Sequence, residues 1–334
     1  MQPTRRGLLR LAGAAALAVP CVARAEPGMI RMGIQYGVTY LPFAVAQHER
    51  TIERRAKEAG LGEIKVEWNR VAGGNVLNDS LLAGQMDCAA TGYPSFFILW
   101  SKTRGRQAIK GLMSYGNTPL FLLTRNPAVN SIAEFTDADR ITVPAVKSSV
   151  QAMMLQMAAE KQWGQFDRLD RLTISRGHPD AIAALLSMSG EIDSAFSAPP
   201  YQYTALERPG IHVVTTSEQI FGGPCSNGIL YMTEAFHDAN PGAAKAIGLG
   251  LRDGLALINE DPRRAAEMYL AATGEKERIE MILRTVTAPG TKFEAAPRGV
   301  MRFADFMRRT GSIPKAPAEW KEVFFREAHD LPGD

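Results

Sequence analysis

The order of apolar and polar positions predicts alternating strands and helices from residue 29 onward. Residues 29–34 form an apolar run typical of a buried strand, and residues 64–68 alternate apolar and polar side chains as a second strand does. Between them, Pro42 suits the first turn of a helix that we expect to run over 42–59. A further helix is expected to begin at 73–75. This strand–helix order predicts a doubly wound α/β sheet.

One short pattern then occurs twice. Residues 81–94 and 185–200 each read as a helix end, a glycine that stops it, a short buried strand and a loop that ends in proline. We expect the aspartate at each strand entry to accept hydrogen bonds from nearby backbone N–H groups. A repeat this widely spaced is not a solenoid and predicts two similar lobes with a cleft between them, where small ligands bind. Four residue pairs align without a gap: Gly84 with Gly190, Asp87 with Asp193, Ala89 with Ala195, and Pro94 with Pro200.

The rest of the chain completes this two-lobed plan. The apolar runs 119–123 and 228–232 are predicted to cross between the lobes, with strands of the second lobe at 140–144, 172–174 and 211–214. Ser148 is predicted to cap a helix over 150–157. Helices are expected at 241–259, 262–273, 276–286 and 297–309, packed back on the first lobe. The expected organisation is an export signal at 1–25, a discontinuous lobe 1 of 26–119 and 228–334, and an inserted lobe 2 of 120–227.

The first 25 residues have the composition of an export signal. A basic stretch with Arg5 and Arg6 precedes an apolar run at 11–19 and a small-x-small cleavage pattern at 23–25. The adjacent arginines indicate the twin-arginine route to the periplasm; an uncleaved anchor is the alternative. Because this segment carries four arginines and no acid, its removal lowers the formal net charge from +3 to −1. The mature protein is therefore near neutral, and nucleic acid is not an expected partner.

Composition excludes several classes of function. The chain has 334 residues, 46% of them hydrophobic and 22% charged, as in ordinary soluble proteins. Outside the export signal, no apolar run approaches the ~20 residues of a membrane span. The five histidines are scattered and we expect no metal site. Hydrolase and phosphate-loop motifs are missing, so we expect no enzyme activity and no cofactor. In the mature chain, Cys88 and Cys225 either form a disulfide or remain free thiols.

Several segments of this chain resemble the periplasmic substrate-binding proteins of ABC importers. The resemblance rests on the Y-G-V-T-Y-L-P-F loop at 36–43 and on the segments 72–87, 179–200 and 227–246. It covers about residues 29–325, and the most similar group is that of the sulfonate, taurine and nitrate binders with the related thiamine-pyrimidine-precursor binders. It implies a type II fold of two lobes, each a mostly parallel sheet flanked by helices. Two crossover strands would join the lobes, which would close on a ligand by a hinge.

The same resemblance implies a periplasmic protein that delivers a small organic molecule to an ABC permease and its ATPase, acting as a monomer. We expect the hinge near 118–121 and 226–229. A sulfonate-like anion would use the N–H groups at helix starts, whereas a pyrimidine or aromatic ligand would stack on tyrosines. Alternatives are a ligand sensor for a membrane receptor and an enzyme of pyrimidine-precursor synthesis. The enzyme would need a cysteine-rich iron motif that isolated Cys88 and Cys225 do not supply.

The candidate ligand contacts are the loops at strand ends and the starts of helices. Tyr40→Ala and Tyr93→Ala are expected to weaken binding with little change in melting temperature. Asp87 and Asp193 are interpreted as structural. The predicted contacts are Thr39, Tyr40, Gly74, Asn75, Gly92, Tyr93, Pro94, Asn117, Thr118, Ser148, Ser149, Ser197, Ala198, Pro199, Ser226 and Asn227.

Overall fold

A computed structural model describes residues 27–187, 190–223 and 225–334. The expected export signal at 1–25 lies outside the described residues, as do Met188 and Ser189, which lengthen the second copy of the repeat. Within the described ranges, no helix combines the length and the apolar character that crossing a bilayer requires.

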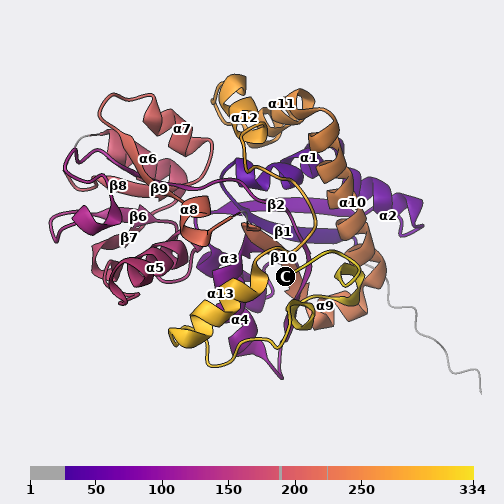
Figure 1. The fold of residues 1–334 in the computed structure, drawn as a ribbon. Coiled ribbons are helices and arrows are strands. Elements are labelled where there is room, and N and C mark those ends of the chain that lie inside the picture. Colours follow the sequence, from indigo (N-terminus) through magenta and orange to yellow (C-terminus); the bar gives the residue numbers. More distant parts are fainter. Residues whose placement is uncertain (1–26, 188–189, 224) are drawn as a thin grey trace, which may run out of the picture.

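The chain forms two five-stranded mixed sheets (Figure 1). In the first sheet the order is β2-β1-β3-β10-β4, where β1 is parallel to β2 and β3, and β10 is antiparallel to both of its neighbours. We call this sheet with its helices lobe 1. Its strands are β1 (Met29–Gln35), β2 (Lys65–Val71), β3 (Cys88–Gly92), β4 (Ile109–Ser114) and β10 (Gly228–Thr233).

The second sheet repeats this topology in the order β7-β6-β8-β5-β9, and β5 is its one reversed strand. We call it, with its helices, lobe 2. The reversed strands come from the two apolar runs expected to cross between lobes, so the α/β two-lobed prediction is confirmed. The strands of lobe 2 are β5 (Phe121–Thr124), β6 (Ile141–Val143), β7 (Thr173–Ser175), β8 (Ser194–Ser197) and β9 (His212–Thr216).

Helices cover both faces of the sheets. The core of lobe 1 alternates along β10: Leu230 and Met232 face one helical layer, whereas Ile229 and Tyr231 face the other. The helices of lobe 2 are α5 (Val150–Trp163), α6 (His178–Leu186), α7 (Tyr201–Leu206) and α8 (Ser217–Phe221). The remaining α-helices are α1 (Leu41–Glu49), α2 (Thr51–Glu58), α3 (Gly74–Leu82), α4 (Tyr93–Thr103), α9 (Glu234–Ala239), α10 (Pro241–Glu260), α11 (Pro262–Thr273), α12 (Ile279–Val286) and α13 (Val300–Arg309). Short 3₁₀ helices are η1 (Val38–Tyr40), η2 (Ile132–Glu134), η3 (Asp170–Leu172), η4 (Trp320–Val323) and η5 (Arg326–Ala328).

The single helix predicted over 42–59 is wrong, because the chain breaks at Arg50, which has a left-handed φ of 51°. The break redirects α2 onto α10, where Thr51 Oγ1 donates to the Gly250 carbonyl at 2.7 Å. A Cβ on Gly250 would lie 2.7 Å from the Ile52 nitrogen, so the two helices approach at a residue that has none. Tertiary packing therefore overrides the local preference for one long helix.

The loop expected to end at Pro94 is also wrong, since α4 begins at Tyr93, directly after β3. Pro94 sits in the first turn of α4, where a missing N–H costs no hydrogen bond. By contrast, Gly84 and Gly190 both adopt the expected left-handed conformation, with φ of 67° and 84°.

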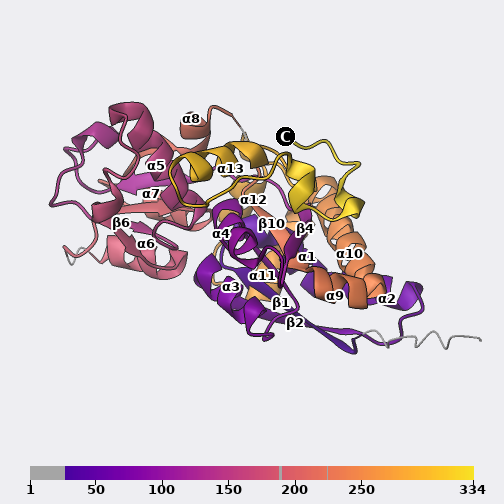
Figure 2. The same ribbon diagram turned by 90° about the horizontal axis from the view of Figure 1, so that it is seen from below.

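The helix α13 touches both lobes rather than lobe 1 alone (Figure 2). It packs on α4, and its Phe303 ring lies 5.1 Å from the ring of Phe221 on α8, centroid to centroid. Near its C-terminal end, Arg309 pairs with Glu160 of α5. One apolar face of α13 thus joins a core that runs from one lobe to the other.

Cys88 and Cys225 are free thiols, so the disulfide alternative does not hold in this structure. Cys88 lies in the core of lobe 1, where its sulfur is 3.4 Å from the sulfur of Met32. Burial raises the pKa of both thiols. They therefore behave as small apolar core residues.

Candidate functional site

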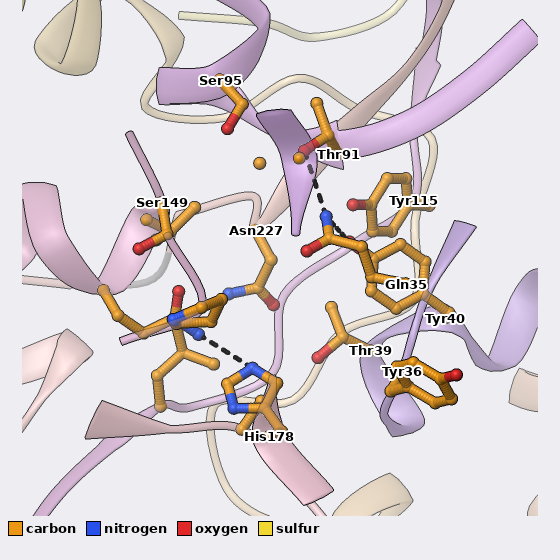
Figure 3. A pocket seen from close by; sticks show the side chains of 17 residues that line it. Gln35, Tyr36, Thr39, Tyr40, Thr91, Ser95, Tyr115, Ser149, His178 and Asn227 are labelled. Carbon is orange, nitrogen blue, oxygen red and sulfur yellow. Dashed lines mark hydrogen bonds between the residues drawn. The ribbon is translucent and has the colours of Figure 1, made fainter. Parts of the chain in front are cut away.

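A cavity lies between the two lobes, at the edge where β1, β3, β6 and β8 end (Figure 3). This is the edge of an α/β sheet where ligands bind. Its empty volume is about 480 Å³, including solvent at the mouth. Its walls are Gln35, Tyr36, Thr39, Tyr40, Gly74, Thr91, Gly92, Ser95, Tyr115, Leu120, Pro144, Ser149, Val150, Gln151, His178, Ala198 and Asn227.

Four helices begin at the wall of this cavity. Gly74 and His178 are the first residues of α3 and α6, while Gly92 and Ser149 are the N-caps of α4 and α5. Helix N-termini carry partial positive charge and unpaired N–H groups, so their convergence favours anionic or acceptor-rich ligands. None of the described residues that line the cavity is an aspartate, glutamate, lysine or arginine. The positive potential therefore comes from the backbone alone.

The start of α3 depends on a glycine for its position. A Cβ at Gly74 would lie 2.2 Å from Thr91 Oγ1 and 2.5 Å from Ser95 Oγ, closer than a side chain tolerates. The backbone of α3 therefore reaches the cavity wall only because residue 74 has no side chain.

At the start of α5, Ser149 rather than Ser148 caps the helix, which corrects the sequence-based expectation. Ser149 Oγ accepts a hydrogen bond from Ala152 N at 3.2 Å. The carbonyl of Ser148 instead accepts from Ser95 Oγ of lobe 1 at 2.8 Å. Ser148 thus joins the two lobes through its carbonyl, and Ser149, the next residue, lines the cavity.

Asn227 brings an unpaired donor to the cavity. Its Oδ1 accepts from the backbone N–H of Thr118 and from Thr118 Oγ1 at 3.1 Å. With the carbonyl held in this way, Nδ2 is buried and has no hydrogen-bond partner among the described residues. Only 5% of Asn227 is exposed. A buried donor without an acceptor is costly, so a ligand acceptor at this point would be strongly favoured.

Gln35 and two tyrosines form the polar wall on the lobe 1 side. Gln35 Nε2 donates to Tyr40 Oη at 2.8 Å and to Thr91 Oγ1 at 3.1 Å, and Figure 3 shows it between the two. The ring centroids of Tyr40 and Tyr115 are 5.4 Å apart. Burial raises the pKa of both phenols, which therefore stay neutral.

His178 supplies the matching wall on the lobe 2 side. Its Nε2 lies 3.3 Å from Gln151 Nε2 and its Nδ1 lies 3.5 Å from Ser197 Oγ. Burial lowers the pKa of His178 to about 4, so the imidazole is neutral at physiological pH. With Gln151 as donor, Nε2 accepts and the ring proton sits on Nδ1. The site therefore offers a neutral ring, not a cation, beside the helix N-termini.

The structure gathers part of the sequence-predicted set around this cavity. Whether any of these residues contacts a ligand stays a prediction. Those that line it are Thr39, Tyr40, Gly74, Gly92, Ser149, Ala198 and Asn227.

The other predicted residues lie near the cavity without lining it. Tyr93 is fully buried and bonds Ser114 Oγ at 2.8 Å. Thr118 positions Asn227, and the carbonyl of Pro199 accepts from the backbone N–H of Val38 across the lobes at 2.9 Å. Phe96, the aromatic residue nearest to Tyr93 in the sequence that could also stack on a ligand, is fully buried against Tyr231. The remaining residues outside the lining are Asn75, Pro94, Asn117, Ser148, Ser197 and Ser226.

Sequence reasoning missed more than half of the walls of the cavity. Two positional signals were available: Gln35 is the last residue of β1, and His178 directly precedes Pro179, which marks the first turn of α6. Gln151 follows the predicted cap, Ser148, by three residues. The missed residues are Gln35, Tyr36, Thr91, Ser95, Tyr115, Leu120, Pro144, Val150, Gln151 and His178.

No protein-family model and no curated protein matches this sequence. Solved structures do match it. The alkanesulfonate-binding protein SsuA from Xanthomonas axonopodis pv. citri, bound to MOPS, is 17% identical with a TM-score of 0.68, over 86% of this chain and 92% of that chain. The aliphatic sulphonate binding protein SsuA from Escherichia coli is 16% identical with a TM-score of 0.66, over 91% and 99% of the two chains.

The periplasmic nitrate-binding protein NrtA from Synechocystis PCC 6803 is 15% identical with a TM-score of 0.68, over 90% of this chain and 87% of that chain. The expected resemblance to sulfonate and nitrate binders is thus confirmed in three dimensions. At these identities the likeness establishes the fold, and ligands named for the neighbours remain theirs. The chain has the two-lobed α/β fold of periplasmic binding proteins.

Proposed function

We propose that this chain is the exported solute-binding component of an ABC-type importer, which captures a small organic molecule between its lobes in the periplasm. The observation that carries the proposal is the interlobe cavity, where four helix N-termini and the unpaired Asn227 amide converge with no charged side chain in the described lining. The fold shared with sulfonate- and nitrate-binding proteins supports the same role. Delivery to a permease and its ATPase, export by the twin-arginine route and a monomeric state belong to this proposal.

We also propose that the units 26–119 with 228–334 and 120–227 move against each other about a hinge near 118–121 and 226–229. In support, Thr118 and Asn227 belong to the two different crossovers and are hydrogen-bonded to each other. This pair would keep the crossovers in register while the lobes rotate. A ligand hydrogen-bonded to Asn227 would then act directly on the hinge.

The ligand that the cavity favours is a monoanion with an organic body, such as a sulfonate, or an acceptor-bearing pyrimidine or aromatic compound. Backbone N–H groups and Asn227 Nδ2 suit oxygen or ring-nitrogen acceptors. Tyr36, Leu120 and Val150 supply apolar surface for the body of the ligand. A dianion would lack a countercharge, because no lysine or arginine is among the described residues of the lining.

A thermal-shift screen tests the proposal directly. The purified protein would be heated with sulfonates, nitrate, bicarbonate, pyrimidines and aromatic acids, since a ligand at ~100 times its Kd stabilises the native state by about 2.7 kcal/mol. We expect a clear shift with one chemical class. If none of these compounds raises the melting temperature, the assignment of the ligand class fails.

The variant Asn227→Asp sharpens this test, because it replaces the unpaired donor with an acceptor of the same shape. Loss of a hydrogen bond to an anionic ligand would weaken binding roughly 10- to 100-fold. Asn130→Asp adds the same charge at an exposed position and serves as the control. Equal affinity of the two variants would exclude Asn227 from the binding site.

A further inference from the structure

A strip of polar contacts joins the lobes at the rim of the cleft. Tyr201 Oη donates to Glu275 Oε1 at 3.0 Å, and Thr204 Oγ1 donates to Glu277 Oε2 at 2.7 Å. Glu207 forms an ion pair with Arg278. In Figure 1, α7 faces the segment between α11 and α12. We call these three contacts the rim contact.

The spacing on α7 explains how one short helix makes all three contacts. Tyr201, Thr204 and Glu207 recur every third residue, so they lie on one face of the helical turn. Their partners are within four residues of one another in the segment before α12. The contact is therefore a continuous seam between one element of each lobe.

Glu275 is the central residue of the rim contact. The same oxygen accepts from Tyr269 Oη of α11 at 3.0 Å, within lobe 1, and from Tyr201 Oη, across the cleft. Burial raises the pKa of Glu275, and the two phenol donors act against this shift. The hydrogen bond from Tyr269 orients the Glu275 carboxylate within lobe 1, and the hydrogen bond from Tyr201 connects this carboxylate to lobe 2.

The other two contacts contribute less. The side chains of Glu207 and Arg278 are 49% and 59% exposed, and ion pairs as exposed as this one contribute little to stability. Thr204 is a neutral donor to a half-buried carboxylate. The Tyr201–Glu275 bond is therefore the contact whose loss should matter most.

Tyr201 also connects the rim to the ligand cavity. Its ring stacks on His178, with centroids 6.0 Å apart and planes 18° apart. His178 lines the inner cavity, whereas Tyr201 and Glu275 line an outer hollow, and Tyr36 is a wall of both. The seam thus stands at the mouth, between the inner cavity and solvent.

We propose that the rim contact is a latch, in which Glu275 holds Tyr201 so that the lobes stay closed over the inner cavity. This inference rests on the proposed function only in that the latch would then retain a captured solute. The latch itself is a property of the closed chain. It is testable with no ligand present, so failure of a ligand screen and failure of the latch are separate results.

Two substitutions form a matched pair for the test. Tyr201→Phe removes the bond across the cleft and keeps the ring on His178. Tyr269→Phe removes a bond of equal length to the same oxygen, but inside lobe 1. Both variants lose one hydroxyl, and only the first loses a connection between lobes.

The measurement is the distance between nitroxide labels on the two lobes by double electron–electron resonance. Lys57→Cys on α2 and Lys161→Cys on α5 place labels at exposed positions, while Cys88 and Cys225 are buried and stay unlabelled. For Tyr201→Phe we expect the ratio of open to closed molecules to rise roughly tenfold, the equivalent of about 1.4 kcal/mol. Tyr269→Phe should match the parent protein, and Glu275→Ala should open as Tyr201→Phe does.

Three results would overturn the latch. The first is a distance distribution for Tyr201→Phe equal to that of the parent. The second is equal opening by Tyr269→Phe, which would show that the loss of any bond to Glu275 has the same effect. The third is a parent protein that is wholly open without ligand, because the contact would then hold nothing closed.

Discussion

Asp87 and Asp193 occupy equivalent positions in the two sheets. Each directly precedes the central strand of its sheet, and each accepts a hydrogen bond from the backbone N–H of an arginine. Arg31 lies in the neighbouring strand β1, and Arg140 directly precedes the neighbouring strand β6. The distances are 2.7 Å from Arg31 to Asp87 and 2.8 Å from Arg140 to Asp193. The match extends to register, because Met32 pairs with Cys88 as Ile141 pairs with Ser194. The sequence repeat is therefore a structural repeat with one aspartate at the entry to each parallel pair.

Asp87→Ala should destabilise the protein more than Arg31→Ala. Loss of the aspartate leaves the Arg31 backbone N–H without its acceptor, which costs about 1.5–3 kcal/mol for a charged partner. Arg31→Ala keeps that backbone bond and removes the ion pair with Asp87 at 2.6 Å and the bond from Arg31 Nη1 to the Gly84 carbonyl at 2.6 Å. The Arg31 side chain is 33% exposed, so we expect a loss of less than about 1 kcal/mol. Urea unfolding of the two variants measures the difference. Equal losses would mean that the side-chain pair, not the backbone bond, stabilises the strand entry.

Ser149→Ala should lower the free energy of unfolding by about 1 kcal/mol, because it removes the side-chain cap of α5. Ser148→Ala is its matched control and should stay within about 0.5 kcal/mol of the parent, since Ser148 contributes its carbonyl to the contact with Ser95. Denaturant midpoints of the two variants test this. If Ser148→Ala lowered the free energy of unfolding more than Ser149→Ala, Ser148 would be the cap after all.

Tyr93→Ala should act on stability, contrary to the sequence-based expectation. Tyr93 is fully buried and stacks on Phe303 with centroids 6.3 Å apart, so truncation should cost about 3–5 kcal/mol. Tyr93→Phe loses only the bond to Ser114, about 1 kcal/mol. Calorimetry of both variants is the check. A Tyr93→Ala protein that melts with the parent would contradict this placement.

His178 should make stability fall with acidity. Because burial lowers its folded pKa to about 4 from 6.5, the unfolded chain binds the proton first as pH falls. Stability is therefore full above about pH 6.5 and is lost progressively down to about pH 4. Between pH 7.5 and pH 5 the parent should lose about 2 kcal/mol more than His178→Phe, in which the ring remains but does not titrate. If the free energies of unfolding of the parent and of His178→Phe had the same pH dependence, His178 would not be a buried neutral imidazole.

Much of the fold could be predicted because its signals are local. Gly84 follows the C-cap of α3 directly and ends that helix by its own backbone freedom, whereas α6 ends earlier than predicted, at Leu186, four residues before Gly190. The apolar runs at 119–123 and 228–232 mark the two reversed strands. The repeat around Asp87 and Asp193 then implied two sheets of one topology. Each of these inferences needed only neighbours in the chain.

Which residues line the cavity could not be predicted, because it depends on how each helix is rotated about its own axis. Tyr93 and Ser95 are two residues apart at the start of α4, and two residues turn a helix by about 200°. Tyr93 therefore enters the core against α13, while Ser95 faces the cavity and the Ser148 carbonyl of the other lobe. That rotation depends on the packing of α4 against several elements, among them α5, β10 and α13, which lie far along the chain.

Local apolar patterns, glycines and prolines were enough to predict the two-lobed α/β plan, the paired aspartates and a cleft between the lobes. Three features emerge from the folded chain alone: His178, Gln151 and Gln35 complete the cavity, α2 breaks from α1 at Arg50, and Glu275 meets Tyr201 at the rim. These features join residues from distant segments or different lobes. Their contacts arise from packing free energy shared across the whole chain, which no local pattern contains.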